Sequence, residues 1–255
     1  MPKIGLAPMA DSTSLMSDLA VLWKLARGMD RSGDHAAKLE SFYAGQADAY
    51  DRFRERLLHG RDELLAKLPL TEGGVLVELG AGTGRNLEPL APRLPGLEAA
   101  YLVDLCPSLL TVAGRRCAGR GWSNAHTVLA DATTWRPPRP ADVVLCAYSL
   151  TMMPDWRAVV ANACAMLKPG GTLAVVDFTA IDVETARLAQ VRSQSRFVRW
   201  GWRTWFGHDG VHPDPALLPH LAARCQTDHQ FVGLGKVPYL PLRAAYLTYL
   251  GRPQG

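Results

Sequence analysis

The chain has 255 residues, of which 48% are hydrophobic and 20% charged, and its formal net charge is +4. This is the composition of an average soluble globular protein, and it excludes disordered, collagen-like and coiled-coil chains. The length suits one large domain, or one domain with additional segments. No stretch approaches the roughly 18 uninterrupted apolar residues of a membrane-spanning helix, and residues 1–14 lack the apolar core of a signal peptide. We therefore expect a cytoplasmic protein.

The positive charge is concentrated toward the end of the chain. Residues 183–255 contain nine Lys and Arg against four Asp and Glu, whereas residues 1–182 contain 19 against 20. A basic segment indicates an acidic partner or surface, although arginines that simply face solvent are the commoner explanation.

The cysteines indicate neither a disulfide framework nor a metal site. They are five, an odd number, widely spaced and without a C-x-x-C pair. His208 and His212 have the spacing of a metal-binding pair, but Gly210 and Pro213 argue against a helix that presents both. We predict no metal.

Two helices are predicted before the first strand. Apolar residues recur at helical spacing in residues 15–28, and a second helical pattern runs over residues 35–68, with a break near Gly60. These helices predict an N-terminal cover over residues 1–70 and a main domain over residues 71–255.

The main domain alternates between short apolar runs and helix-length stretches. Such alternation is typical of a parallel, doubly wound sheet with helices on both faces. The predicted strands span residues 75–79, 100–104, 126–129, 142–147 and 172–177, and the predicted helices span residues 107–120 and 155–167.

The end of the chain differs, because residues 230–235 and 244–250 have strand patterns with two prolines and no helix between them. They predict an antiparallel pair that closes one edge of the sheet. The expected fold class is α/β, a Rossmann-like doubly wound sheet that is mostly parallel with an antiparallel C-terminal strand. The N-terminal helices and a lid insertion at about residues 183–215 complete it.

A glycine-rich loop, E-L-G-A-G-T-G over residues 78–84, follows the first predicted strand. Glycines at alternate positions let the backbone turn sharply and approach a ligand, at the sheet edge where α/β proteins bind ligands. The spacing differs from the G-x-G-x-x-G of dinucleotide-binding folds, since Arg85 stands where the last glycine would be. Glu78 would also repel a pyrophosphate.

Acidic residues end the next two predicted strands. Asp104 is placed to accept hydrogen bonds from both hydroxyls of a ribose, and Asp131 is placed to contact an adenine amino group. Together with Glu78, these carboxylates indicate a ligand with an adenosine and a positively charged amino acid, and without phosphate.

Over about residues 43–178 the chain resembles the class I S-adenosylmethionine-dependent methyltransferases, on the glycine loop, the two aspartates and an L-K-P-G-G motif. The resemblance implies S-adenosylmethionine as cofactor, with Gly80 and Gly82 close to its methionine moiety. Asp104 would bind the ribose and Asp131 the adenine. The predicted cofactor site consists of Tyr50, Arg61, Glu78, Gly80, Ala81, Gly82, Asp104, Leu105, Asp131, Ala132, Tyr148 and Ser149.

Four further segments resemble the N-methyltransferases of betaine-lipid synthesis, which methylate the amino group of diacylglyceryl homoserine. They are residues 41–51, 57–61, 149–156 and 236–241. This resemblance implies N-methylation of an amino group on a lipid-linked or small amino-acid-like substrate. It also implies that Tyr50 and Arg61 cover the cofactor, with Arg61 holding its carboxylate. Packing on Tyr43, seven residues earlier in a helix, explains Tyr50 equally well.

The candidate catalytic residues are Tyr148, His208 and Asp209. The resemblance implies that Tyr148 and Ser149 border the sulfonium and the acceptor. His208 or Asp209 could take the proton that an ammonium acceptor must lose before its nitrogen attacks, although ordinary surface positions are the plainer explanation of both. Because the methyl donor is already activated, alignment and removal of water are the main tasks of the protein.

A basic and aromatic segment lies inside the predicted lid, and it contains Arg192, Arg196, Phe197, Arg199, Trp200, Trp202, Arg203 and Trp205. The spacing predicts one helix with all four arginines on one face. Two alternatives remain for that helix. In the first, it lies in a membrane interface or holds an anionic headgroup. In the second, it is a lid that packs its aromatic residues on the substrate pocket while the arginines face solvent. The first alternative places the protein peripherally at a membrane.

Three other functions fit parts of the pattern. The fold also serves N-, O- and C-methyltransferases of small natural products. A nicotinamide-dependent oxidoreductase or a non-catalytic binding module would contain a similar sheet. We expect a small molecule or a lipid headgroup as the partner, and no nucleic acid.

Overall fold

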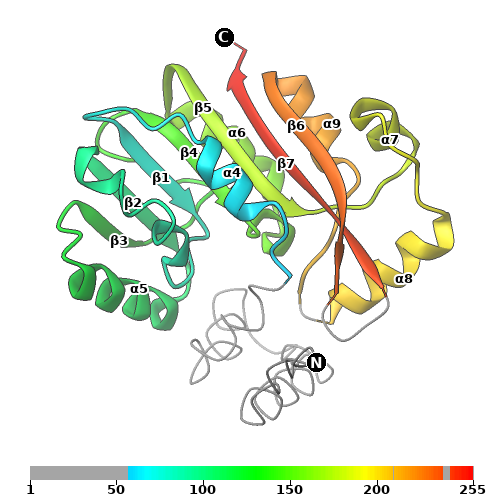
Figure 1. Ribbon diagram of the computed structural model, residues 1–255, viewed down its shortest axis with the longest axis horizontal. Helices are drawn as coiled ribbons and strands as arrows, with labels where there is room; N and C mark the ends of the chain where they lie inside the picture. Colours follow the sequence, from blue (N-terminus) through cyan, green and yellow to red (C-terminus); the bar gives the residue numbers. More distant parts are fainter. Residues whose placement is uncertain (1–56, 209, 238–241, 255) are drawn as a thin grey trace, which may run out of the picture.

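A computed structural model describes residues 57–208, 210–237 and 242–254 (Figure 1). Its centre is a seven-stranded sheet with the order β3-β2-β1-β4-β5-β7-β6. The strands are β1 (Val75–Leu79), β2 (Ala99–Asp104), β3 (Ala125–Leu129), β4 (Ala141–Ala147), β5 (Leu167–Phe178), β6 (Cys225–Lys236) and β7 (Arg243–Pro253). β7 pairs antiparallel with β5 and β6, whereas the pairs among β1 to β5 are parallel. The predicted α/β fold with an antiparallel C-terminal strand is confirmed.

Helices cover both faces of the sheet, and they are α4 (Arg61–Lys67), α5 (Pro107–Arg120), α6 (Trp156–Met166), α7 (Val183–Ala189), α8 (Arg196–Gly207) and α9 (Leu217–Arg224). Alternate residues of a strand point to opposite faces, so the sheet divides the core in two. Leu76 belongs to the same buried cluster as Leu65 of α4, whereas Val77 belongs to the cluster of Val160 in α6 and Leu218 in α9. Because both faces exclude water, the central strands are almost continuously apolar.

Local sequence accounts for two helix starts. α6 begins after Asp155, whose Oδ1 accepts a hydrogen bond from the Ala158 amide at 3.1 Å, as an N-cap residue does. α4 begins after Gly60, which has φ +76°. A Cβ at Gly60 would lie 2.5 Å from a ring carbon of Tyr246 in β7. The chain therefore turns at the predicted break, at a position where only glycine fits.

The segment before β1 belongs to the core as far as the structure describes it. Leu64 and Leu65 of α4 are fully buried, and α4 lies against β5 and β7. The predicted helix over residues 15–28 and most of the predicted N-terminal cover lie outside the described residues.

Two elements differ from the sequence-based expectation. The connection between β1 and β2 forms the short 3-10 helices η1 (Arg85–Leu87) and η2 (Leu94–Gly96), because three prolines within residues 89–95 remove amide donors that an α-helix needs. Helix α9 is not apparent from the sequence. It has eight residues and contains Pro219, which a helix tolerates only in its first turn.

The prediction that four arginines share one face of a helix is wrong for one of them. α8 begins at Arg196, after the N-cap Ser195, whose hydroxyl oxygen accepts a backbone hydrogen bond from the first turn at 3.3 Å. Arg192 therefore lies outside the helix, because the capping serine ends the preceding irregular segment. Only Arg196, Arg199 and Arg203 share a face of α8.

The predicted lid divides into two parts. α7 packs against α9 and β6 and so belongs to the helical layer on the sheet, whereas α8 lies toward the lower right of Figure 1. None of the helices in residues 57–208, 210–237 and 242–254 combines the length and the hydrophobicity that crossing a bilayer requires.

Candidate active site

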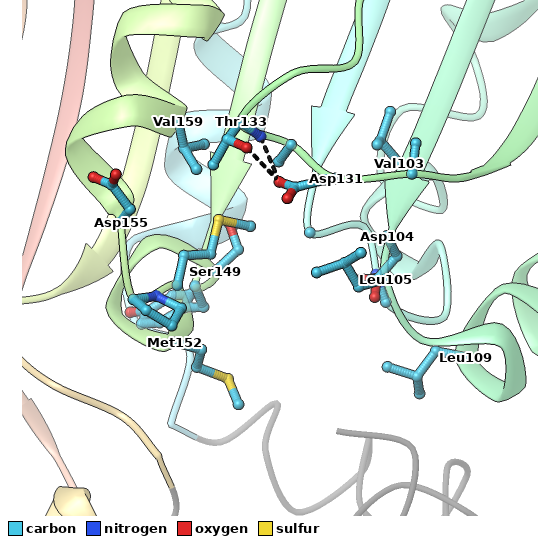
Figure 2. Close-up of a pocket in the computed structure, with 17 residues that line it drawn as sticks. Val103, Asp104, Leu105, Leu109, Asp131, Thr133, Ser149, Met152, Asp155 and Val159 are labelled. Atoms are coloured by element: carbon cyan, nitrogen blue, oxygen red, sulfur yellow. Dashed lines mark hydrogen bonds between the residues drawn. The ribbon is translucent and has the colours of Figure 1, made fainter. Parts of the chain in front are cut away.

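A cavity of about 300 Å³ lies at the carboxyl ends of β1, β2 and β4 (Figure 2). β1 is the middle strand between β2 and β4, and such a switch in strand order is where open α/β sheets bind ligands. The cavity is lined by Gly80, Gly82, Val103, Asp104, Leu105, Leu109, Ala130, Asp131, Ala132, Thr133, Tyr148, Ser149, Met152, Met153, Pro154, Asp155 and Val159. Many of the predicted cofactor residues are thus brought together at one cavity.

The glycine loop is held between β2 and Ser149. The amides of Gly80 and Ala81 both donate to the Val103 carbonyl, at 2.8 and 3.0 Å. Gly80 has φ +73°, and a Cβ there would lie 2.5 Å from the Ser149 Cβ. Gly82 has φ +55°, but a Cβ there would meet no atom within 4 Å. Gly80 is therefore required for packing, whereas Gly82 leaves open space at the cavity wall.

Asp104 joins the end of β2 to the glycine loop. Its Oδ2 accepts a hydrogen bond from the Gly82 amide at 2.8 Å, and its Oδ1 accepts one from the Cys106 amide at 2.9 Å. These bonds fix the orientation of the carboxylate at the cavity wall. Since each carboxylate oxygen has two acceptor sites, bracing the loop and binding a ribose diol are compatible.

Asp131 and Ala132 lie in the loop that follows β3. The Asp131 Oδ1 accepts hydrogen bonds from the amide and the hydroxyl of Thr133, both at 2.8 Å (Figure 2). The Ala132 carbonyl accepts a hydrogen bond from the buried Asn162 of α6 at 2.9 Å. The loop is therefore tied to α6, and the Asp131 carboxylate is held at the cavity.

Glu78 is fully buried at the end of β1. Its Oε1 accepts a hydrogen bond from Asn86 at 2.6 Å, and its Oε2 has no hydrogen-bond partner among the described residues. Burial raises the pKa of Glu78 from its ordinary value of 4.5 to about 8. The Asn86 hydrogen bond and the Arg61 charge oppose this shift, and the Asp104 charge adds to it. A cation bound nearby would favour the ionised carboxylate.

Tyr148 and Ser149 form the turn after β4. Tyr148 has φ +53°, an uncommon value for a bulky residue, of the kind that strained functional turns show. Its hydroxyl donates to the His59 carbonyl at 2.5 Å, and the Ser149 hydroxyl donates to the Leu79 carbonyl at 2.8 Å. Tyr148 therefore lines the cavity while its hydroxyl attaches the segment before α4 to the sheet.

Three predicted cofactor residues among those described are not part of the cavity lining, and they are Glu78, Ala81 and Arg61. Ala81 is buried within the glycine loop. The Arg61 side chain is 11% exposed, and its Nε lies 3.0 Å from Asp62 Oδ1. The guanidinium is close enough to Glu78 to lower its pKa. A role of Arg61 at the cofactor carboxylate remains a prediction.

Of the two candidate proton acceptors, only His208 belongs to the described residues. His208 is exposed directly after α8 and does not line the cavity. Tyr50, predicted to cover the cofactor, and Asp209, predicted to act in catalysis, lie outside the described residues.

Sequence reasoning missed one wall of the cavity. Met152, Met153, Pro154 and Asp155 line it, from the end of the 3-10 helix η3 (Leu150–Met152) to the N-cap of α6. A signal for this wall exists in the sequence. These residues follow the carboxyl end of a buried strand, at the sheet edge where α/β proteins bind ligands.

The cavity wall fits S-adenosylmethionine. It contains three carboxylates, those of Asp104, Asp131 and Asp155, and the described lining has no Lys, Arg or His side chain. Apolar side chains such as Leu105 and Val159 accompany them, as in most small-molecule sites. This combination suits a ligand with a flat base, a sulfonium and an ammonium group.

Gly82→Ala is expected to weaken S-adenosylmethionine binding at least about tenfold, which corresponds to about 1.4 kcal/mol. The added methyl group would occupy space at the cavity wall that the protein itself leaves open. The matched control is Gly121→Ala at the end of α5, since Gly121 has φ +68° and a Cβ there also meets nothing within 4 Å. Both variants carry a similar backbone strain of about 1–2 kcal/mol. Calorimetric titration should show weaker binding only for Gly82→Ala, and an equal loss in both variants would contradict the assignment.

The sequence matches a known protein family over residues 50–217, and this family is described as a methyltransferase domain. The matched range contains all the residues that line the cavity.

Curated relatives match about half of the chain. Trans-aconitate 2-methyltransferase of Methylobacterium radiotolerans is 33% identical over 126 residues, which cover 49% of this chain and 46% of that protein. Demethylmenaquinone methyltransferase of Tropheryma whipplei is 27% identical over 152 residues, which cover 58% of this chain and 62% of that protein. The chain thus matches less than two thirds of the length of these relatives.

A solved structure from Bacillus halodurans C-125 has the same fold. Its TM-score is 0.59 at 17% sequence identity, and the match covers 76% of this chain and 99% of that chain.

Proposed function

Because this chain belongs to the methyltransferase domain family, we propose that it is an S-adenosylmethionine-dependent methyltransferase and that its methyl acceptor is an amine nitrogen. The amine belongs to a lipid-linked or small amino-acid-like molecule. The observation that carries this proposal is the charge of the cavity wall.

Three aspartates line the cavity, each from a different element. Asp104 ends β2, Asp131 follows β3 and Asp155 precedes α6 (Figure 2). Two unit charges 4 Å apart near a protein surface interact by about 4 kcal/mol. An acceptor that carries an ammonium group is therefore attracted to this wall. An anion such as aconitate would need a cationic partner, which the described lining does not provide.

The small volume of the cavity indicates that only part of the acceptor molecule enters it. Its volume of about 300 Å³ is at the lower end of the range for small-molecule sites. With the cofactor in place, little room remains for more than a small headgroup. A headgroup that carries the amine, with the rest of the molecule outside, fits this constraint.

When bound, S-adenosylmethionine supplies an activated methyl group. The protein must keep water away and hold the amine while it loses its proton. Met152, Met153 and Val159 form an apolar wall that excludes water. The exposed Asp155 carboxylate accepts a hydrogen bond from the ammonium group and passes the proton to solvent. Tyr148 acts as a positioning residue, since its hydroxyl already donates to the His59 carbonyl.

The proposal is tested by incubating the full chain and methyl-labelled S-adenosylmethionine with cell extract. The product is then divided into lipid and aqueous phases and analysed by mass spectrometry. We expect the label on nitrogen, stable to mild alkali. Label in an alkali-labile methyl ester, or cofactor binding with no methylated product, would overturn the proposal. The phase that contains the product distinguishes a lipid-linked acceptor from a soluble one.

Asp155→Asn is expected to raise the KM for the amine acceptor about tenfold, since a hydrogen bond to a charged group contributes about 1.5–3 kcal/mol. Asparagine caps a helix as well as aspartate does, so α6 should remain intact. The matched control is Asp182→Asn, because Asp182 caps α7 through the Thr185 amide at 2.8 Å and lies outside the cavity. Steady-state kinetics should show the change in KM only for Asp155→Asn. An unchanged KM in that variant would remove Asp155 from the acceptor site.

A further inference from the structure

Helix α8 exposes large apolar side chains that no described element covers. Phe197 is 78% exposed, Trp200 is 62% exposed and Trp205 is 37% exposed, and Val198 is 43% exposed. The rings of Phe197 and Trp200, one helical turn apart, have centroids 5.8 Å apart. We refer to these four exposed residues of α8 as the apolar strip. Several large apolar side chains exposed on one short helix are typical of an interaction surface rather than of an ordinary solvent-facing helix.

Arginines accompany this strip, and the neighbouring sequence contains no acidic residues that would neutralise them. The 24 residues between Glu184 and Asp209 contain five arginines and no acidic residue. Arg196, Arg199 and Arg203 lie on one face of α8 beside the apolar strip, since residues three and four positions apart are neighbours on a helix. No ion pair joins these three guanidinium groups to a carboxylate among the described residues. The surface is therefore complementary to a partner with negative charge.

The opposite face of α8 is fixed to the core near the cavity. Phe206 is buried, and its ring centroid lies 4.6 Å from that of Phe178 in β5. The Phe178 ring in turn lies 4.8 Å from the ring of Tyr148, which lines the cavity. The exposed strip is thus held in a fixed position by a series of ring contacts that ends at the site of methyl transfer.

The paired strands β6 and β7 bring a second group of similar residues to the same end of the sheet as α8 (Figure 1). Leu234 and Leu242 are 48% and 50% exposed, and Lys236 and Arg243 are exposed beside them in sequence. Residues 229–243 contain no Asp or Glu. Exposed apolar and cationic side chains are therefore contributed by β6 and β7 as well as by α8.

We propose that α8, together with the ends of β6 and β7 that lie at the same end of the sheet, forms a docking surface for an anionic lipid bilayer. Tryptophan and phenylalanine insert at the level of the headgroups, and flanking arginines bind lipid phosphates and carboxylates. This inference goes beyond the proposed function, because the surface lies outside the cavity and its binding needs neither cofactor nor acceptor.

A bilayer fits these observations better than a nucleic acid does. Nucleic acid attracts arginines equally well, and aromatic rings can stack on single-stranded bases. The proposed surface, however, also contains Val198, Leu234 and Leu242, aliphatic side chains that gain from burial in lipid and cannot stack on bases. RNA binding is therefore the competing outcome of the experiment.

The test is co-sedimentation of the full chain with vesicles of phosphatidylcholine and phosphatidylserine, or of phosphatidylcholine alone, at low and high salt. The unsubstituted protein should sediment with the anionic vesicles at low salt and be released by high salt, because salt screens exposed charges. Replacing Arg196, Arg199 and Arg203 with Gln should lower partitioning about a hundredfold, since each basic side chain contributes roughly fivefold near an anionic surface. Phe197→Ser with Trp200→Ser should lower it without changing the net charge.

The matched control replaces three exposed arginines on or after α5, Arg115, Arg120 and Arg136, with Gln. It removes the same charge and should retain vesicle binding, and calorimetric affinity for S-adenosylmethionine should be unchanged in all variants. The proposal is overturned if the unsubstituted protein fails to sediment at low salt, if the control loses as much binding as the α8 variant, or if RNA is bound while vesicles are not. A methylated amine product with no vesicle binding would overturn this inference alone and leave the proposed function standing.

Discussion

Asp104→Ala is expected to weaken the binding of S-adenosylmethionine and of its demethylated product by about a hundredfold or more. The substitution leaves two ribose hydroxyls without their acceptor, and each unsatisfied polar group costs about 1–3 kcal/mol. It also releases the Gly82 and Cys106 amides, which the carboxylate holds at 2.8 and 2.9 Å. The glycine loop loses its attachment to β2 at the same time as the cofactor loses a contact.

A carboxylate at the opposite edge of the sheet provides the control. Asp142, at the start of β4, accepts a hydrogen bond from the Val75 amide at 2.8 Å, so Asp142→Ala removes a similar strand-to-strand bond far from the cavity. Both variants should be less stable to urea, but only Asp104→Ala should bind the cofactor more weakly in calorimetry. Native affinity in a folded Asp104→Ala protein would refute the ribose assignment.

Two of the strands that build the site, β1 and β4, can be predicted because they are buried along their length. β1 and β4 are almost continuously apolar and buried, so their carboxyl ends can be located without knowledge of the strand order. Parallel strands bring these ends to one edge. Gly80 follows β1, Asp104 ends β2 and Asp131 follows β3. Sequence reasoning could therefore find these residues at strand ends, and the structure places all three at the cavity.

Contacts between distant parts of the chain could not be predicted in the same way. Tyr148 donates to the His59 carbonyl 89 positions earlier, and Asn162 of α6 holds the loop of Ala132. Such pairs depend on how helices pack on the sheet, and a strand pattern leaves that packing open. The exposure of the α8 aromatic residues has the same origin, because periodicity shows that a helix is amphipathic but not which part of its apolar side is covered.

Glu78 should make the protein less stable as the pH rises from 4.5 to about 8. Burial raises the pKa of this carboxyl group from 4.5 to about 8 in the folded protein, so within this window the folded state binds more protons than the unfolded state. The free energy of unfolding decreases as the pH rises wherever the folded state binds more protons than the unfolded state. One pKa unit corresponds to about 1.4 kcal/mol, so several kcal/mol present below pH 4.5 are lost by pH 9.

Glu78→Gln is expected to remove this loss. Glutamine retains the shape of the side chain and an Oε1 that can accept the Asn86 hydrogen bond, but it cannot ionise. The variant should match the parent in stability near pH 4.5 and exceed it by several kcal/mol at pH 9. Urea denaturation at intervals between these pH values measures the difference, which isolates Glu78 because all other titrating groups are common to both proteins.

Asp142→Asn provides a control in which the sign is reversed. Burial opposes ionisation of Asp142, but hydrogen bonds from Lys168 and the Val75 amide outweigh it, and the pKa of this carboxyl group is lowered from 3.8. Its stabilising contribution is present above the unfolded pKa and lost as the pH falls through the folded pKa. Asp142→Asn should therefore be less stable than the parent at neutral and alkaline pH, and the difference should shrink in acid. If Glu78→Gln instead destabilises the protein equally at all pH values, the buried carboxyl group is ionised throughout and holds a partner that keeps its pKa low.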